Sequence, residues 1–398
     1  MHKIEGEKRV RIKKSKLLFF FYAIIMLWPE YFSNSLTGLM ANALALVGIL
    51  FAFKNSKRIS RFSILAAVYF VYFVVDTYFH GGGDIHTLIS NMKIVISIMF
   101  VDVYLTKEDQ YDTISTIFWI VFFFAMLNFA TLLLFPNGMY QISTVWNEWG
   151  TTTYALYWIF GSKNSHAFWY LLLEILVGLR CYIRPSRKNK ILTYLCLPIS
   201  ILSQMILGSS TATIATIIGA AGVLSVVLFK KWNKEINAYF ILCANFVFNA
   251  LLIFGMTGFL GGIVHALFNK DLTFSNRTIA WGKAVTNILQ RPITGTGILT
   301  SDEMKSVLGS LSFNQAHNEW LQCLWQGGII LFVILVLLLI TIAGKINRIQ
   351  HRNLRFMCCM FFISVFIEMA FEVWLGLVFT WLMLLLIYKA ESIQSEVG

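Results

Sequence analysis

The chain has few charged residues for its length. Of its 398 residues, 13% are Asp, Glu, Lys or Arg, whereas a soluble domain carries about 25%. Because 58% of the residues are hydrophobic, the polar side chains are too few to cover a water-facing surface. The chain also lacks any repeat, linker or low-complexity tract that would mark a separate soluble domain. These deficits exclude an ordinary water-soluble enzyme.

Long apolar runs take the place of that missing surface. Runs of about 18 residues recur along the chain, which is the length of a helix that crosses a ~30 Å hydrocarbon core. They predict an all-α polytopic membrane protein with about 12 transmembrane helices. The predicted spans are 17–33, 36–53, 62–79, 88–105, 114–135, 165–183, 191–207, 212–229, 238–260, 318–343, 356–370 and 372–388.

The N-terminus lacks a small-residue cleavage site of the secretory type. Residues 1–16 carry seven Lys and Arg, and the apolar run that follows ends in Pro29 and Glu30. We therefore expect a retained first helix. A basic tail beside such a helix is typical of an orientation signal next to anionic lipid, so the net charge of +12 does not indicate a nucleic-acid partner.

The six cysteines lack both disulfide and metal-ligand patterns. None falls in the segments assigned below to the outer face, and no pair has the spacing of a metal site. We expect them to be small packing residues, and we expect no cofactor.

The positive charges alternate along the connecting segments. One set of segments holds 25 Lys and Arg and the opposite set holds 6. This bias predicts that both termini are cytoplasmic. It divides the chain into a basic cytoplasmic tail (1–16), helices 1–9 (17–260), a large outer loop between helices 9 and 10 (261–316), helices 10–12 (317–388) and a second cytoplasmic tail (389–398).

The large outer loop contains an expected amphipathic helix over Asn276–Gln290. Its apolar residues recur with helical periodicity, Ser275 or Asn276 can cap its start, and Arg291 ends it. Arg277 lies on the apolar face of this helix. Two interpretations stay open, since the guanidinium could reach lipid phosphate at the interface or could point into a cavity and bind a phosphate with two hydrogen bonds.

Two further patterns follow in the same region. Gly295-Thr-Gly297 fits a simple tight turn, or more weakly a phosphate-binding loop. His317 is placed in the first turn of the tenth span, where the helix dipole favours a neutral imidazole that can accept a proton. A lone histidine there can be structural, but the polar run His317-Asn318-Glu319 favours function.

Charged residues within the spans are further candidates. Lys93 and Glu174 lie deep in their spans, and the expected structural explanation is an ion pair between packed helices. Glu368 and Glu372 mark a tight hairpin between the last two spans. They could bond sugar hydroxyls or form a solvated turn.

The order of these motifs resembles the O-antigen ligase and Wzy-type polysaccharide polymerase family. The resemblance rests on Arg277-xxx-Trp281, on Arg291-Pro-Ile-Thr-Gly-Thr-Gly, on Ala316-His-Asn-Glu-Trp and on Gly161-Ser-Lys-Asn. It implies a GT-C-like fold and an outward-facing, metal-independent glycosyltransferase. The donor implied is an undecaprenyl-diphosphate-linked oligosaccharide.

The resemblance also implies roles for individual residues. Arg277 would bind the diphosphate and His317 would act as the base. The remaining candidates for substrate binding are Lys163, Asn164, Arg291, Asn318, Glu319 and Glu372. Members of the family commonly have an arginine between spans 7 and 8, where this chain has Gly208-Ser-Ser-Thr. We expect Lys163, or else Arg291, to replace it.

The function expected from these features is polymerisation of lipid-linked repeat units into an O-antigen or capsule at the outer face of a bacterial cytoplasmic membrane. Membrane lipid, a chain-length regulator and a flippase are the expected partners. Two alternatives stay open. One is a ligase that transfers glycan to a lipid A core. The other is a flippase or secondary transporter, which the absence of visible internal symmetry disfavours.

Overall fold

The computed structural model describes residues 14–80, 85–145, 152–229, 235–254, 277–309 and 315–397. The expectations for the basic tail before residue 14, for the caps Ser275 and Asn276, and for much of the 261–316 loop lie outside these residues.

Each of the twelve predicted spans coincides with a helix. The helices are α1 (Lys14–Met26), α2 (Ser35–Lys54), α3 (Arg61–His80), α4 (Ile85–Lys107), α5 (Gln110–Leu134), α6 (Ala167–Ile183), α7 (Arg187–Ile206), α8 (Ser210–Leu228), α9 (Ala238–Ile253), α13 (Glu319–Arg348), α14 (Arg352–Phe371) and α15 (Val378–Val397). Short 3-10 helices, η1 (Glu30–Phe32) and η2 (Ser56–Arg58), follow α1 and α2. The nearly all-α, polytopic architecture is therefore confirmed.

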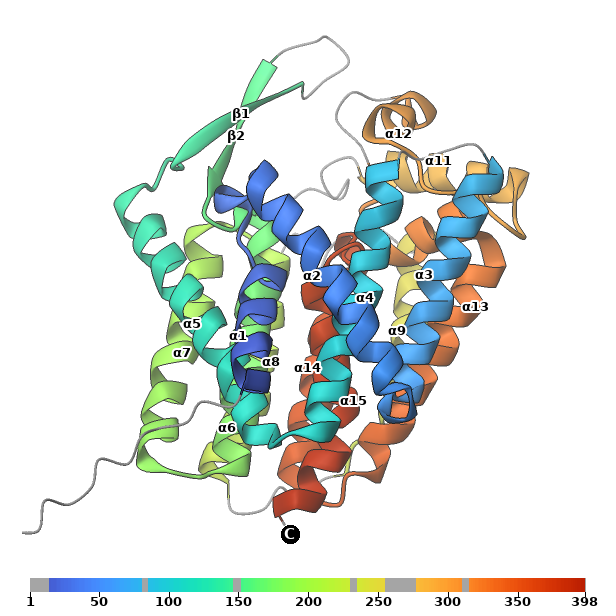
Figure 1. Cartoon of the computed structure of the whole chain (residues 1–398). Helices are drawn as coiled ribbons and strands as arrows, with labels where there is room; N and C mark the ends of the chain where they lie inside the picture. The colour runs from blue at the N-terminus through green and yellow to red at the C-terminus, as the bar shows by residue number, and fades with distance from the viewer. Residues whose placement is uncertain are drawn as a thin grey trace, which may run out of the picture.

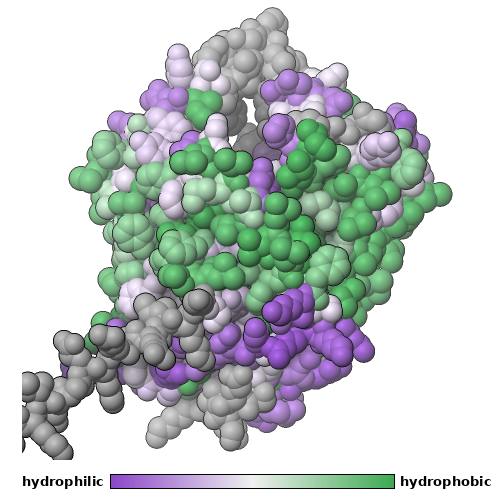
Figure 2. Space-filling model, viewed as in Figure 1, coloured by the Kyte–Doolittle hydropathy of each residue, from purple (hydrophilic) through white to green (hydrophobic). Residues whose placement is uncertain are grey.

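The surface of the bundle is that of a membrane protein. Eight of the described helices are long and apolar enough to cross a bilayer, namely α2 to α6, α8, α13 and α14. On the face shown in Figure 2, apolar residues form a band across the middle of the molecule, and polar residues gather toward both ends. Helix α2 exposes Leu39, Leu50 and Phe53 by 66%, 71% and 76%, which would be costly in water. The chain is a multi-pass membrane protein.

Helix α6 forms the centre of the bundle. Every residue from Ala167 to Tyr182 is buried, and α6 packs against α5, α7, α8 and α15. A helix that is hydrophobic on all sides is expected to be enclosed by other helices. Glu174 lies within α6 and does not pair with Lys93, so the expected ion pair between these two residues is wrong. Among the described residues, no carboxylate lies within ion-pair distance of Lys93.

Helix α13 is broken in its middle at Gly328. This residue has φ +60°, and a Cβ atom there would lie 2.2 Å from the carbonyl oxygen of Ile293. The segment after α11 fills the break, since Gly297 donates to the carbonyl of Gln326 at 2.8 Å and Ile329 donates to that of Pro292 at 2.9 Å. Backbone groups at membrane depth need such internal partners. The Gly295-Thr-Gly297 motif is thus a turn that packs on α13.

One end of the bundle carries the structures outside the spans. A three-stranded antiparallel sheet of β1 (Tyr140–Val145), β2 (Thr152–Trp158) and β3 (Gly161–Ser162) lies there. Two helices, α11 (Arg277–Gln290) and α12 (Ser301–Leu308), lie at the same end, and the C-terminus lies at the opposite end (Figure 1). We call this end the α11 end. The sheet is a departure from the all-helical expectation, although the Tyr and Thr residues of both strands, with Ile and Val in β1 and Trp in β2, are typical of β-structure.

The predicted hairpin between the last two spans is present at residues 372–377. Helix α14 ends at Phe371 and α15 begins at Val378, six residues later than the predicted start at 372. Glu368 and Glu372 are 2% and 6% exposed. The solvated-turn interpretation of these two carboxylates is therefore wrong.

Candidate functional site

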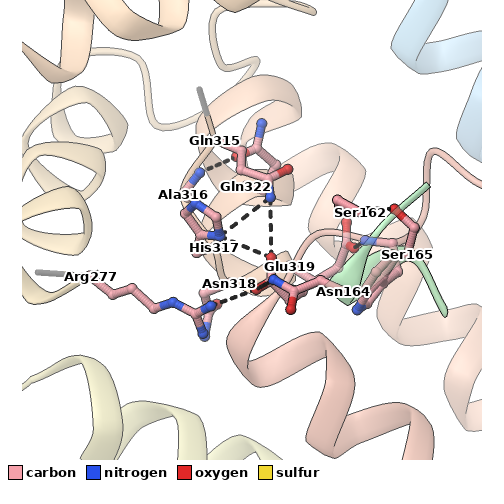
Figure 3. A network of polar contacts seen from close by, with 12 residues as sticks. Ser162, Asn164, Ser165, Arg277, Gln315, Ala316, His317, Asn318, Glu319 and Gln322 are labelled. Atoms are coloured by element: carbon pink, nitrogen blue, oxygen red, sulfur yellow. Dashed lines mark hydrogen bonds and ion pairs between the residues drawn. The ribbon is translucent and has the colours of Figure 1, made fainter. Parts of the chain in front are cut away.

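The side chain of Glu372 is the centre of a polar network at the α11 end. Its Oε1 atom accepts hydrogen bonds from Arg277 Nη2 at 2.5 Å and from Asn164 Nδ2 at 2.7 Å. Its Oε2 atom lies 2.9 Å from His317 Nδ1 and accepts a hydrogen bond from Gln315 Nε2 at 3.2 Å. Figure 3 shows the labelled side chains converging from different parts of the chain. Three segments that are distant in sequence therefore meet at a carboxylate that a fourth segment supplies.

The charge on Glu372 sets the tautomer of His317. Burial by itself raises the pKa of Glu372, but the hydrogen bonds and positive charge supplied by His317 and Arg277 outweigh burial and hold that pKa below its ordinary value of 4.5. The ionised carboxylate can only accept hydrogen bonds. Nδ1 of His317 must then carry the proton, and in the neutral ring Nε2 carries the lone pair.

The backbone of His317 is held in an unusual conformation. Its φ of +48° is the only positive value of a non-glycine residue in the described part of the chain. Such residues cluster at functional sites, where surrounding contacts hold them in place. The residue lies just before the helix instead of in its first turn, because Asn318 is the N-cap of α13 and its side chain accepts from the backbone N–H of Leu321.

Helix α11 positions Arg277. Ala280, Trp281 and Ala284 pack with Leu321 and Trp325 of α13 in one apolar cluster, so the apolar stripe faces the protein. Arg277 is the first residue of α11, and its side chain is 19% exposed beside Glu372. The guanidinium therefore points into the network and not along a lipid-facing surface. Leu289, at the far end of the stripe, remains 74% exposed.

Asn164 is positioned by a 3-10 turn, η3 (Lys163–His166), at the entrance of α6. The buried His166 ring anchors this turn, since its Nδ1 lies 3.1 Å from Asn128 Nδ2 and its Nε2 lies 3.3 Å from the Gly161 carbonyl oxygen. The adjacent Lys163 is exposed, and its ammonium group is outside the network.

The other candidates lie outside the network as well. Asn318 donates to Asn249 Oδ1 at 3.0 Å, in addition to capping α13. Glu319 is 3% exposed and accepts from the backbone N–H groups of Trp374 and Leu375 at 2.5 and 2.9 Å, which fixes the α14–α15 turn. Arg291 follows the C-terminus of α11, about 20 Å from Arg277 by the rise of a 14-residue helix.

Gln315 is a member of the network that the sequence did not indicate. It lies in an irregular segment without periodicity, and only its place two residues before His317 could have suggested it. In the described residues, no three His, Cys, Asp or Glu side chains stand together as a candidate metal site.

A similarity to a known protein family covers part of this site. Residues 195–336 match the family model described as O-antigen ligase. The match confirms the resemblance. It extends from α7 past the break in α13 and includes Arg277 and His317, but Asn164 and Glu372 lie outside it. No curated protein matches the chain. The match supports ligase- or polymerase-type processing of a polysaccharide and fits both activities equally.

The arrangement brings together a cation, a ring nitrogen and two side-chain amides around one carboxylate. In the described structure, the contact of Arg277 with Glu372 uses Nη2, which leaves the donors on Nε and Nη1 for a phosphate. His317 supplies a nitrogen lone pair for a hydroxyl proton. Asn164 and Gln315 supply amides that can bond sugar hydroxyls.

Proposed function

We propose that the protein polymerises undecaprenyl-diphosphate-linked oligosaccharide repeat units into an O-antigen or capsular polysaccharide at the outer face of the bacterial cytoplasmic membrane. The observation that supports the proposal is the shared contact of Arg277 and His317 with Glu372. One carboxylate holds an anion-binding group and a proton acceptor within a single site, next to a membrane span.

The reaction follows from these roles. A hydroxyl group of the acceptor sugar attacks the anomeric carbon of the donor sugar, and a new glycosidic C–O bond forms. The bond from the anomeric carbon to the diphosphate breaks, and the electron pair leaves with the lipid diphosphate. The hydroxyl proton goes to His317 Nε2. Glu372 stabilises the imidazolium, and Arg277 stabilises the charge on the diphosphate.

The description of the matching family favours a second candidate, a ligase that transfers a finished glycan to a lipid A core. The two activities share the donor class and differ in the acceptor. Neither the polar network nor the family match distinguishes the two activities, so an experiment that identifies the acceptor is needed to separate them.

The experiment is an in vitro reaction of the purified protein, reconstituted in liposomes, with lipid-linked repeat units as the sole sugar substrate. A ladder of products rising by one repeat supports the polymerase. Transfer only when a lipid A core is added supports the ligase instead. If wild-type protein and the Arg277→Ala and His317→Ala variants all give no new glycosidic bond while substrate crosses the bilayer, a flippase is the better description.

A further inference from the structure

A second polar site, with a lining that does not include the residues of the Glu372 network, lies inside the membrane-spanning region. A cavity of about 570 Å³ opens between α1, α2, α4 and the α14–α15 turn. Helix α4 supplies six polar residues to its wall, and four of them follow one face of the helix with helical spacing, namely His86, Ser90, Lys93 and Ser97. None of the mechanistic roles proposed above uses these residues.

Lys93 is the charged group of this cavity. It belongs to the candidate membrane span Ile85–Lys107 and is half-buried. No carboxylate of the described residues pairs with it. A cation at membrane depth is costly, and in membrane proteins it usually faces a cavity where it meets an anion.

The opposite wall of the cavity is apolar. Ile25, Met26 and Leu44 line it from α1 and α2, Leu377 lines it from the last hairpin, and Phe379 lines it from the start of α15. Helix α2 is the least buried of the candidate spans, at 17%, so this wall adjoins lipid. A cation on one side and an apolar wall on the other match an amphiphile with an anionic head group.

The cavity adjoins the catalytic region. Asn91 and Gly376 line it, and they also line a smaller cavity of about 160 Å³ with Gln322, Gln326 and Val373. Val373 is the residue after Glu372. A molecule seated at Lys93 would thus have its head group separated from the network by the short 373–376 turn.

We propose that this cavity binds the phosphate-bearing head group of a second lipid-linked substrate, with Lys93 as the cation that pairs with it. The assignment rests on the proposed function, in which a polymerase handles two lipid diphosphates at once. Arg277 then holds the donor diphosphate, and the Lys93 cavity holds that of the acceptor. The class of ligand is a lipid phosphate or diphosphate.

The test measures binding without turnover. The full-length protein in phosphatidylcholine nanodiscs is titrated with a sugar-free polyprenyl diphosphate, and bound lipids are counted by native mass spectrometry. We expect two bound molecules for the wild type and one for Lys93→Met, whose remaining site retains its affinity. The Kd of the polyprenyl diphosphate at the Lys93 cavity should rise by about tenfold or more in this variant. Lys93→Arg keeps the positive charge and should bind two molecules. Lys57→Met, which removes an exposed lysine, is the control and should bind as the wild type does.

Four results would overturn the proposal. The first is an unchanged number and affinity of bound lipids in Lys93→Met. The second is inorganic diphosphate binding at this site as tightly as the lipid-linked form. The third is phosphatidylglycerol displacing polyprenyl diphosphate at equal concentration, which overturns the acceptor assignment. Loss of binding in Lys93→Arg together with a lowered melting temperature would mean that Lys93 only supports the fold, and this also counts against the proposal.

Turnover by the wild type separates this failure from failure of the proposed function. If the wild type produces a ladder of products and Lys93→Met binds lipid as the wild type does, the proposed lipid site is wrong and the proposed function stands. Lys93-dependent binding without any wild-type glycosyl transfer would overturn the proposed function and its acceptor assignment while leaving the lipid site intact. In a working polymerase, Lys93→Met should raise KM for the acceptor repeat and change kcat little.

Discussion

Glu372 Oε2 lies 2.9 Å from Nδ1 of His317, although 55 residues separate them in sequence. The carboxylate fixes the ring orientation and the tautomer, as in other sites where a carboxylate supports a histidine base. Because Oε1 of the same carboxylate contacts Arg277, a change at Glu372 should affect both the proposed base, His317, and the proposed anion-binding group, Arg277.

Replacing Glu372 by Gln should reduce glycosyl transfer by about 100-fold or more, because the neutral amide cannot stabilise the imidazolium that forms when His317 takes a proton. The measurement is the initial rate of product formation with lipid-linked repeat units. Asp302→Asn is the matched control, since Asp302 is an exposed carboxylate at the α11 end, with a side chain 93% exposed. A rate within about twofold of wild type for Glu372→Gln would contradict the role given to Glu372.

Stability should depend on the ionisation of Glu372. Its pKa in the folded protein lies below 4.5, so at acid pH the unfolded chain binds this proton more readily than the folded chain does. The contribution is fully present above pH 4.5 and is lost as the pH falls through the lower folded value. We expect the melting temperature of the wild type to fall more steeply than that of Glu372→Gln between about pH 5 and pH 3. Parallel curves for the two proteins would show that the network adds no acid-dependent stability.

The spans could be predicted from the sequence because a membrane helix is defined by the length and composition of one continuous segment. Apolar length placed a predicted span on each of twelve helices, of which eight are long and apolar enough to cross a membrane. The break in α13 was not predicted, since 318–343 was expected to be one continuous span, although Gly327-Gly328 interrupts its apolar run. Its pairing with the turn at Gly295-Thr-Gly297 was not predicted either, because no local pattern connects residues 30 positions apart.

The network itself was only partly predictable for the same reason. Arg277 and His317 stand in recognisable motifs, whereas the carboxylate that joins them belongs to the last hairpin. Three glutamates could have joined Arg277 and His317, namely Glu319, Glu368 and Glu372. The packing of α11 against α13 and α14 determines which one does. The outcome left Glu319 bonded to backbone N–H groups and Glu372 bonded to the cations.

The break in α13 should be essential to stability. Gly328→Ala would place a Cβ atom 2.2 Å from a carbonyl oxygen, at a residue with φ +60°, and should lower the free energy of unfolding by about 2–4 kcal/mol. Gly38→Ala in α2 is the control, because a Cβ atom there meets nothing within 4 Å, and this change should be neutral or slightly stabilising. Thermal unfolding in detergent compares the two. Equal melting temperatures would mean that the break can relax without cost.

His317 allows its chemistry to be separated from its backbone conformation. Asparagine tolerates the left-handed region better than most residues, so His317→Asn should retain the fold while losing the ring that accepts the proton. We expect glycosyl transfer to fall by about 100- to 10,000-fold, with the melting temperature changed by only a few degrees. His317→Gly relieves the strain at φ +48° and should be equally inactive. If His317→Gly were inactive and His317→Asn active, the backbone conformation would matter and the imidazole would not be the base. The rates should be measured at a saturating concentration of donor repeat units. They then report kcat, because weaker binding of the donor no longer contributes.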